Sequence, residues 1–461
     1  MNGGKRAYLA SPRRRSLLKS AAASMLLAAA QRNLAFAQSS PDYKALVCIY
    51  LEGGNDGENT LIRFDNAGYQ NYASIRSIAS GINIAQGQLL PIQPTTLGTP
   101  FGFHPACAPL KALFDQKKLA VVANMGVLVQ PSTKTGLEVQ GAPRPANLFS
   151  HSDQALAQQT ANHAGLSRVG WGGRVADRLD AIYPDALFPS LVSTNGVKTF
   201  TSGLTSIPLT VPEYPYFALN PSGDNQGQFD ALREGAMREI LSQSSPNIYD
   251  KFGQLLSQDG LDASSVIQPI LQTGNSVAAP FFDNLNGSIA RQLRMIAALI
   301  EGRAQTQLQR QVFFAQQWGY DTHGSQPGTH QHLLGELAPA IKAFDDAMAA
   351  LGVAGDVTTF TLSDFGRTLK PASNIGTDHG WGNYAFVIGG AVKGGDFYGT
   401  VPTQVLNGPD DLGTDGRWIP TTSLEQYGAT LLHWFGIPQS DLPYVFPNIG
   451  AFGNTNMGFM A

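Results

Sequence analysis

Strand-like apolar runs alternate with amphipathic helical segments along most of this chain. Residues 45–51 form an apolar run, residues 105–114 follow a helical pattern, and residues 119–125 form a second apolar run. Short apolar runs separated by helical segments are typical of βαβ units. The pattern therefore predicts an α/β fold with a mostly parallel central sheet. The alternation continues with apolar runs at 311–318, 357–362 and 386–388, a helical period at Leu333, Leu337, Ile341, Phe344 and Met348, and an amphipathic helix over 424–435.

Residues 180–287 interrupt this alternation with frequent prolines. Helical patterns return within this segment at 228–242 and 248–256. We interpret 180–287 as a cap or insertion that shapes access to a site, within a single domain over 38–461. An ordinary elaboration of the fold without a functional role is the alternative.

The N-terminal residues predict an export signal. Residues 14–19 read Arg-Arg-Ser-Leu-Leu-Lys, a twin-arginine pattern, and Ala35-Phe36-Ala37 offers a cleavage site. The apolar stretch between them is about ten residues long, too short to span a bilayer of ~30 Å. We expect a signal peptide over 1–37 and a periplasmic or secreted mature protein without a transmembrane anchor. A basic anchor helix that stays attached is the alternative.

The charge balance of the mature chain argues against nucleic acid as a partner. The sequence has 31 Lys and Arg against 34 Asp and Glu, and residues 1–37 hold seven of the basic residues and no acidic one. Removing the signal leaves 24 basic residues against 34 acidic ones, a formal net charge of -10. Such a surface repels phosphate backbones.

The two cysteines point to buried core positions more than to a disulfide. Cys48 lies inside the apolar run 45–51, where a buried thiol is expected. A disulfide between Cys48 and Cys107 is the alternative.

Three glycine-flanked turns carry carboxylates or imidazoles. They contain Asp56, the pair Asp321 and His323, and the pair Asp378 and His379. Carboxylate oxygens and imidazole nitrogens bind divalent metals. Because loops at the carboxyl ends of parallel strands meet at one edge of a sheet, the turns after 45–51 and 311–318, and Asp364 after 357–362, are expected there together. Turn capping by the Asp residues and structural roles for the histidines are the alternative.

Seven motifs stand in order along the chain: Glu52-Gly53-Gly54-Asn55-Asp56-Gly57, Ser150-His151, Gly170-Trp171-Gly172-Gly173-Arg174, Asp321-Thr322-His323, Ser363-Asp364-Phe365-Gly366-Arg367, Gly376-Thr377-Asp378-His379-Gly380 and Gly394-Gly395. Together they resemble the exported domain-of-unknown-function family 1501. That family is similar in turn to the sulfatase and alkaline phosphatase superfamily. The resemblance implies a three-layer α/β fold of the alkaline phosphatase-like type, with a dinuclear metal site that hydrolyses phosphate or sulfate esters.

The resemblance also implies site residues. Two divalent ions would be held by Asp56, Asp321, His323, Asp364, Asp378 and His379. A nucleophile of the superfamily sits at a helix start near the metals, which favours Ser150, with Ser152 as the substitute. N-capping of the following helix is the alternative role for either serine. The sequence departs from the superfamily at Asp364-Phe365-Gly366, where Asp-His-Gly is common.

Arg367 follows the 357–362 run closely. Its guanidinium is suited to gripping an anionic ester, or to a salt bridge with a neighbouring acid. The sequence leaves the metal open among zinc, manganese, iron, magnesium and calcium. The leading hypothesis is an exported metal-dependent hydrolase of anionic esters. The alternative is a non-catalytic periplasmic or surface binding or assembly protein on the same fold, with a structural metal or none.

Overall fold

A nine-stranded mixed sheet forms the centre of the protein. The computed structural model describes residues 42–182, 188–214, 227–247, 249–251, 253–254, 257–258, 260–263, 276–306 and 308–461. The strand order is β13-β5-β12-β9-β1-β8-β6-β7, and β14 pairs with β5. Of these described strands, β12 runs antiparallel to both neighbours, and the other pairings are parallel. The strands are β1 (Lys44–Glu52), β5 (Leu119–Gly126), β6 (Leu191–Ser193), β7 (Leu209–Thr210), β8 (Arg310–Trp318), β9 (Val357–Ser363), β12 (Asn383–Gly389), β13 (Asp396–Tyr398) and β14 (Thr422–Ser423).

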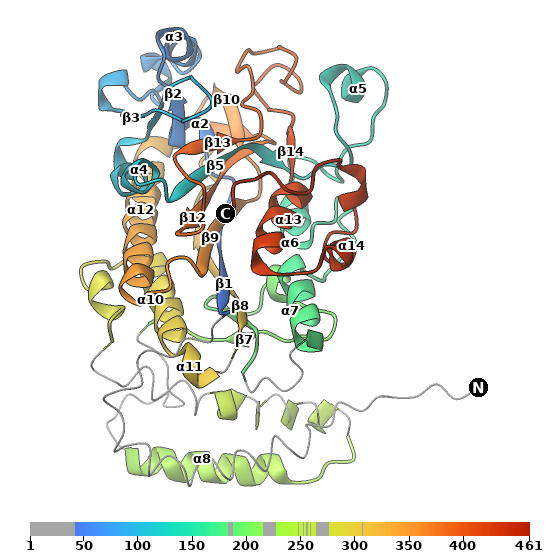
Figure 1. Cartoon of the computed structure of the whole chain (residues 1–461). Helices are drawn as coiled ribbons and strands as arrows, with labels where there is room; N and C mark the ends of the chain where they lie inside the picture. Colours follow the sequence, from blue (N-terminus) through green and yellow to red (C-terminus); the bar gives the residue numbers. More distant parts are fainter. Residues whose placement is uncertain are drawn as a thin grey trace.

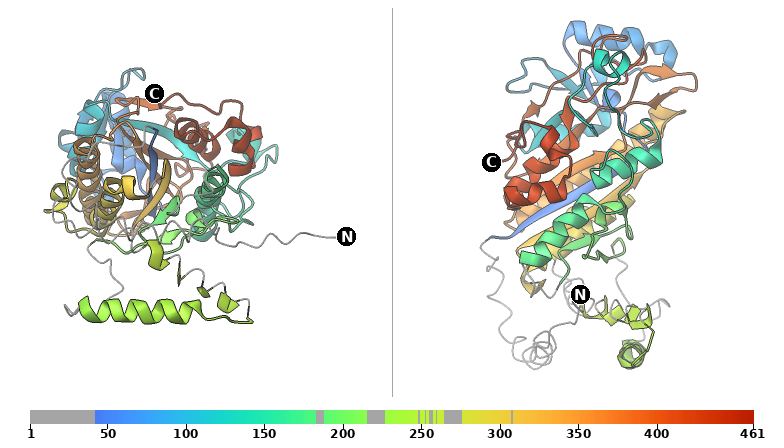
Figure 2. Two further views of the ribbon diagram at one scale, coloured as in Figure 1. Left: turned by 60° about the horizontal axis from the view of Figure 1, so that its bottom comes forward. Right: turned by 90° about the vertical axis from the view of Figure 1, so that its right-hand side faces the viewer.

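Helices cover both faces of the sheet (Figures 1 and 2). Alternate residues of β1 enter two different cores: Val47 and Ile49 pack on one face, and Leu46 and Cys48 on the other. This alternation of sides is what a strand buried between two helical layers requires. The predicted three-layer, mostly parallel α/β fold is confirmed. The first layer contains α4 (Ala108–Asp115), α10 (Ser288–Glu301) and α12 (Gln326–Ala350), and the second contains α6 (His151–Thr160), α7 (Trp171–Ile182), α13 (Leu424–Phe435) and α14 (Leu442–Val445).

Most predicted elements are present with closely similar bounds. The predicted helix 105–114 begins as the 3₁₀ turn η3 (Pro105–Cys107) and continues as α4. Helix α13 has the predicted bounds because its ends are encoded locally. The Ser423 side chain accepts from the Gln426 N–H in a capping box, and Gly436 ends the helix at φ 94°.

Smaller elements cover the carboxyl end of the central strands. The antiparallel hairpin of β10 (Arg367–Ala372) and β11 (Gly376–His379) follows β9 directly. A second sheet has the order β2-β4-β3. Its strands are β2 (Leu61–Arg63), β3 (Leu90–Ile92) and β4 (Phe101–Phe103), and the remaining described α-helices include α2 (Gly57–Thr60), α3 (Asn66–Ile75), α5 (Lys134–Glu138), α8 (Gly227–Ser242) and α11 (Arg303–Thr306).

The strand register brings three loops to one edge. Glu52 at the end of β1 is level with Trp318 at the end of β8, and Leu51 is level with Ser363 at the end of β9. The loops that follow these three parallel strands therefore leave the sheet side by side, as the sequence pattern predicted.

The described residues of the predicted cap or insertion 180–287 lie in more than one part of the molecule. Its strands β6 and β7 extend the central sheet. Helix α8 lies beyond the end of the sheet at which β1 begins, opposite the loops just described (Figure 1). This helix therefore does not cover the carboxyl edge. The predicted signal peptide 1–37 lies outside the described residues.

Both cysteines are free and buried. The expectation of a buried Cys48 thiol is thus confirmed, and Cys48 and Cys107 form no disulfide with each other. No helix among the described residues is both long and apolar enough to cross a membrane.

Candidate metal centre

Three histidines and one aspartate converge at the carboxyl edge of the sheet. His151 opens α6, Asp321 and His323 lie in the loop after β8, and His379 ends β11. One potential ligand atom from each lies within 4.8 Å of the other three. Asp321 Oδ1 is 3.0 Å from His151 Nε2, 3.1 Å from His323 Nε2 and 3.7 Å from His379 Nε2. The Nε2 atoms of His323 and His379 are 2.7 Å apart.

Neighbouring groups fix the ring orientation of two of these histidines. His151 Nδ1 lies 2.8 Å from Asp364 Oδ2, and His379 Nδ1 lies 2.6 Å from the Phe149 carbonyl oxygen. A carboxylate and a carbonyl only accept, so Nδ1 carries the proton in each ring. The Nε2 lone pairs of His151 and His379 are therefore directed at the centre, which is how metal-binding histidines are held.

The pKa values of these two histidines shift in opposite directions. The hydrogen bond to Asp364 is the main reason that the pKa of His151 is raised above its usual value, and burial opposes this rise. Burial lowers the pKa of His379, and the hydrogen bond to the Phe149 carbonyl works against that shift. Because a histidine must be neutral to bind a metal, an ion bound here would displace any proton on His151 Nε2.

A buried arginine holds Asp321. Arg367 is 1 % exposed, and its Nη2 lies 2.5 Å from Asp321 Oδ1. The same guanidinium donates to the carbonyls of Gly54 at 2.9 Å and Thr377 at 3.2 Å. Burial pushes the pKa of Asp321 upward, but the hydrogen bond and charge of Arg367 outweigh it and the pKa is lowered. Asp321 is thus held ionised, ready to act as a ligand.

The glycines of the first turn allow the loops to pack this closely. Gly53 has φ +110°, and a Cβ there would lie 2.4 Å from the Asp321 backbone nitrogen. Gly54 has φ +80°, and a Cβ there would lie 2.7 Å from the Phe365 ring. That ring packs 4.7 Å from the His151 ring and 4.8 Å from the His379 ring, measured between centroids. The motif therefore serves backbone packing against the ligand loops.

The donor set fits a single transition-metal ion. Ligand atoms at 2.0–2.1 Å around a tetrahedral zinc stand about 3.3 Å apart, close to the separations around Asp321. His151 Nε2 is buried and makes no hydrogen bond within the described residues, although Asp321 lies 3.0 Å away. An imidazole nitrogen and a carboxylate oxygen that face each other at this distance are suited to a shared cation.

Three of the six predicted metal ligands come together here: Asp321, His323 and His379. Asp364 lies behind His151, and its carboxylate also accepts from the Tyr50 hydroxyl at 2.7 Å. Asp378 lies at the exposed rim, 3.9 Å from His323 Nδ1 and 3.3 Å from an Arg417 nitrogen.

Asp56 is occupied elsewhere. Its two carboxylate oxygens lie 2.7 and 3.0 Å from the Arg76 guanidinium, and both side chains are fully buried. Gln326 donates to the same carboxylate at 2.5 Å, and the Glu58 N–H donates to it at 3.1 Å. Burial raises the pKa of Asp56, yet Arg76 lowers it overall. The Arg76 guanidinium therefore neutralises this carboxylate, and Asp56 is not among the residues that cluster at the candidate metal centre.

Ser150 occupies the N-cap position of α6, one residue before His151. Its hydroxyl donates to Asp153 at 2.5 Å and lies 3.1 Å from the Ser152 hydroxyl. Arg367, the other predicted catalytic residue, faces Asp321 from within the core and not the solvent.

His151 is the clustered residue that was not among the predicted ligands. The sequence motifs single it out only as the neighbour of Ser150. The sequence did contain a signal for this residue: an imidazole in the first turn of a helix expected near the metal-binding loops. The position that favoured the adjacent serine as a nucleophile favoured this imidazole equally as a ligand.

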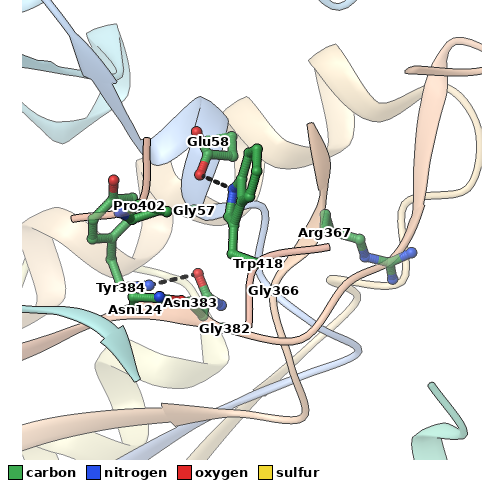
Figure 3. Close-up of a pocket in the computed structure, with 10 residues that line it drawn as sticks. All are labelled: Gly57, Glu58, Asn124, Gly366, Arg367, Gly382, Asn383, Tyr384, Pro402 and Trp418. Atoms are coloured by element: carbon green, nitrogen blue, oxygen red, sulfur yellow. Dashed lines mark hydrogen bonds between the residues drawn. The ribbon is translucent and has the colours of Figure 1, made fainter. Parts of the chain in front are cut away.

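A second group of side chains lines a small pocket (Figure 3). Arg367 is one of its lining residues, but its guanidinium points away from Trp418 and Glu58. None of the four clustered residues lines it. The lining residues are Gly57, Glu58, Asn124, Gly366, Arg367, Gly382, Asn383, Tyr384, Pro402 and Trp418.

Several solved structures are similar to the chain, at low identity. The match with the PsFucS1 sulfatase from Pseudoalteromonas sp. has 8% identity and a TM-score of 0.34, and covers 94% of this chain and 73% of that one. The match with BT1596, a 2-O GAG sulfatase, has 11% identity and a TM-score of 0.31, covering 88% and 74%. The match with the alkaline phosphatase from the Antarctic bacterium TAB5 has 11% identity and a TM-score of 0.26, covering 76% and 92%. The fold class of this protein follows from its strand order and not from these matches.

No curated protein matches the chain. A family model matches part of the chain. The matched part is shorter than the span of the seven motifs, because it starts after the first three of them. It includes Asp321, His323 and His379, and excludes His151. As the motifs predicted, residues 295–445 match the family described as Protein of unknown function (DUF1501).

Proposed function

We propose that this protein is an exported metal-dependent hydrolase of phosphate or sulfate esters. The observation that carries the proposal is the convergence of three imidazoles and one carboxylate at the carboxyl edge of the sheet. Two of the imidazoles are held by groups that leave Nε2 free to bind an ion. Ligand sites in open α/β sheets gather at this edge.

His151, Asp321, His323 and His379 would hold one ion, of which zinc fits the donor set best. When bound, such an ion acts as a Lewis acid toward an ester oxygen. The sequence predicted two ions, but Asp56 is neutralised by Arg76 and Asp364 is engaged with His151 and Tyr50. The proposal is therefore one ion per chain.

Other residues would prepare the site and supply the nucleophile. Asp364 and Arg367 hold two of the ligands in place. Ser150 is the proposed nucleophile: its Oγ forms the bond to phosphorus or sulfur, and its proton passes to Asp153. The alcohol leaves with a proton from solvent, and water then cleaves the serine ester and restores Ser150.

Metal content and turnover of the mature chain test this proposal together. We expect about one equivalent of metal per chain by elemental analysis, and turnover of 4-nitrophenyl phosphate or 4-nitrophenyl sulfate. Asp321→Ala and His323→Ala should lose both properties. His332→Ala removes an exposed histidine of α12 and is the matched control, which should keep both.

Variants of the two serines test which of them is the nucleophile. Ser150→Ala should abolish turnover while metal content stays, and Ser152→Ala should retain turnover. One equivalent of metal with no turnover of either ester would favour the non-catalytic binding protein. A metal-free protein whose stability is insensitive to His323→Ala would contradict the metal centre itself.

A further inference from the structure

A row of three side chains extends from the metal centre across the edge of the sheet. Glu52 ends β1, Trp318 ends β8 beside it, and Lys198 precedes the 3₁₀ turn η4 (Thr199–Thr201) that follows β6. Glu52 lies two residues after Tyr50, which packs in the α6 and α7 layer. Since side chains two apart point to the same face of a strand, Glu52 continues that face toward the loops.

Glu52 interacts electrostatically with residues of the candidate centre and with Lys198. Burial raises its pKa, the Asp364 charge adds to the rise, and the charges of Lys198 and His151 oppose it. Its carboxylate therefore sits within electrostatic reach of both the centre and Lys198. Glu52 Oε2 is buried and has no hydrogen-bond partner in the part of the chain that the structure describes. A buried unpaired carboxylate oxygen is costly for the fold, and a ligand hydroxyl would satisfy it.

Trp318 is far more exposed to solvent than the other tryptophans of this protein. It is 57% exposed, whereas the other four, Trp171, Trp381, Trp418 and Trp434, are each 8% exposed or less. The Lys198 ammonium lies 4.9 Å from its ring centroid. An exposed indole at the edge of a site keeps its large apolar surface in water unless a ligand covers it.

We propose that Glu52, Trp318 and Lys198 form the subsite for the alcohol part of the ester, and that this part is a polyhydroxylated ring such as a sugar. The C–H face of such a ring packs on the indole. Its hydroxyls donate to the Glu52 carboxylate and accept from the Lys198 ammonium. This inference rests on the proposed function, because it assigns the substrate class of the same site.

The test compares an ester that carries a sugar ring with one that does not. Glucose 6-phosphate with glucose 6-sulfate, and methyl phosphate with methyl sulfate, are the probes. We expect Trp318→Ala and Glu52→Gln each to lower the ratio of kcat/KM for the sugar ester to that for the methyl ester by about tenfold. Tyr249→Ala, which removes an exposed aromatic elsewhere, should leave the ratio unchanged. A ratio that neither subsite variant alters would overturn the subsite and leave the hydrolase proposal intact.

A binding measurement covers the case in which the wild type hydrolyses no ester. The proposed function then fails, and the metal-loaded protein is titrated with glucose 6-sulfate while tryptophan fluorescence is followed. A saturable change that disappears in Trp318→Phe supports the subsite. No saturable change, or one that Trp318→Phe keeps, overturns it.

Discussion

At the scale of single residues, the candidate centre depends on which nitrogen of each histidine carries its proton. His151 faces Asp364 through Nδ1, and His379 faces a carbonyl oxygen through Nδ1. These partners are not ligands, but they decide whether Nε2 presents a lone pair or a proton. In the proposed centre, Asp364 would therefore support metal binding from behind His151.

We predict that Asp364→Asn weakens metal binding by about 10–100-fold without unfolding the protein. The neutral amide oxygen still accepts from His151 Nδ1 and from the Gly53 N–H, but it accepts more weakly than the carboxylate does. His151 Nε2 is then less basic and binds the ion less tightly. Competition with a chelator measures the affinity.

The control for this variant is Asp115→Asn, which changes an aspartate on the surface of α4. It should bind metal like the wild type. Equal affinity in Asp364→Asn and Asp115→Asn would contradict the role of Asp364.

At the scale of elements, the close approach of loops decides the shape of the centre. The β10–β11 hairpin sets His379 opposite Arg367 in its register, and Arg367 reaches Asp321 after β8. The first turn, after β1, packs onto that same loop through Gly53. Each connection joins segments distant in sequence, so the geometry of one loop depends on the backbone of another.

We predict that Gly53→Ala lowers metal affinity by at least about tenfold, because the new Cβ would displace the backbone of Asp321. Gly413→Ala is the matched control. Gly413 also has a positive φ, +89°, but a Cβ added there would have no atom within 4 Å. Both variants should lose on the order of 1 kcal/mol of stability from backbone strain, and only Gly53→Ala should lose metal. Wild-type affinity in Gly53→Ala would disprove the packing argument.

Helix α13 carries a pH-dependent element in its first turn. Glu425 is buried, its Oε2 has no partner among the described residues, and burial raises its pKa to about 7. Below the unfolded pKa of ~4.5 both states hold the proton. As the pH rises from there to about 7, only the native state keeps it, so Glu425 progressively destabilises the fold.

We therefore predict that Glu425→Gln gains stability relative to the wild type between pH 5 and pH 8, by about 1 to 3 kcal/mol. Urea unfolding at several pH values measures the difference. Glu239→Gln, at an exposed position of α8, should show a pH-independent difference. A constant difference for Glu425→Gln would show that Glu425 ionises normally in the native state.

At the scale of the whole molecule, one buried ion pair links parts that are far apart in the sequence. Arg76, which follows α3, contacts Asp56 after β1 and donates to the carbonyls of Thr368 and Leu369 in β10. A buried pair of this kind contributes little net free energy, but removing one partner leaves an uncompensated charge in the core.

We predict that Asp56→Ala lowers the free energy of unfolding by about 3–5 kcal/mol, while metal content stays at the wild-type level. The control Asp115→Ala breaks the partly exposed pair with Lys111 in α4 and should cost at most about 1 kcal/mol. If Asp56→Ala does not fold, Asp56→Asn serves as the milder variant. Loss of metal in a stable Asp56 variant would show that Asp56 is a metal ligand and would contradict this prediction.

The sequence by itself determined the order of strands and helices, the edge at which the loops gather, and three of the four clustered residues, Asp321, His323 and His379. These follow from apolar periodicity and turn chemistry, which act over short separations along the chain. Only the tertiary structure decided that His151 joins them, with its partner Asp364 213 residues away. It also decided that Arg76 and not a metal neutralises Asp56, because the group that faces a buried carboxylate is chosen by long-range packing that no local pattern encodes.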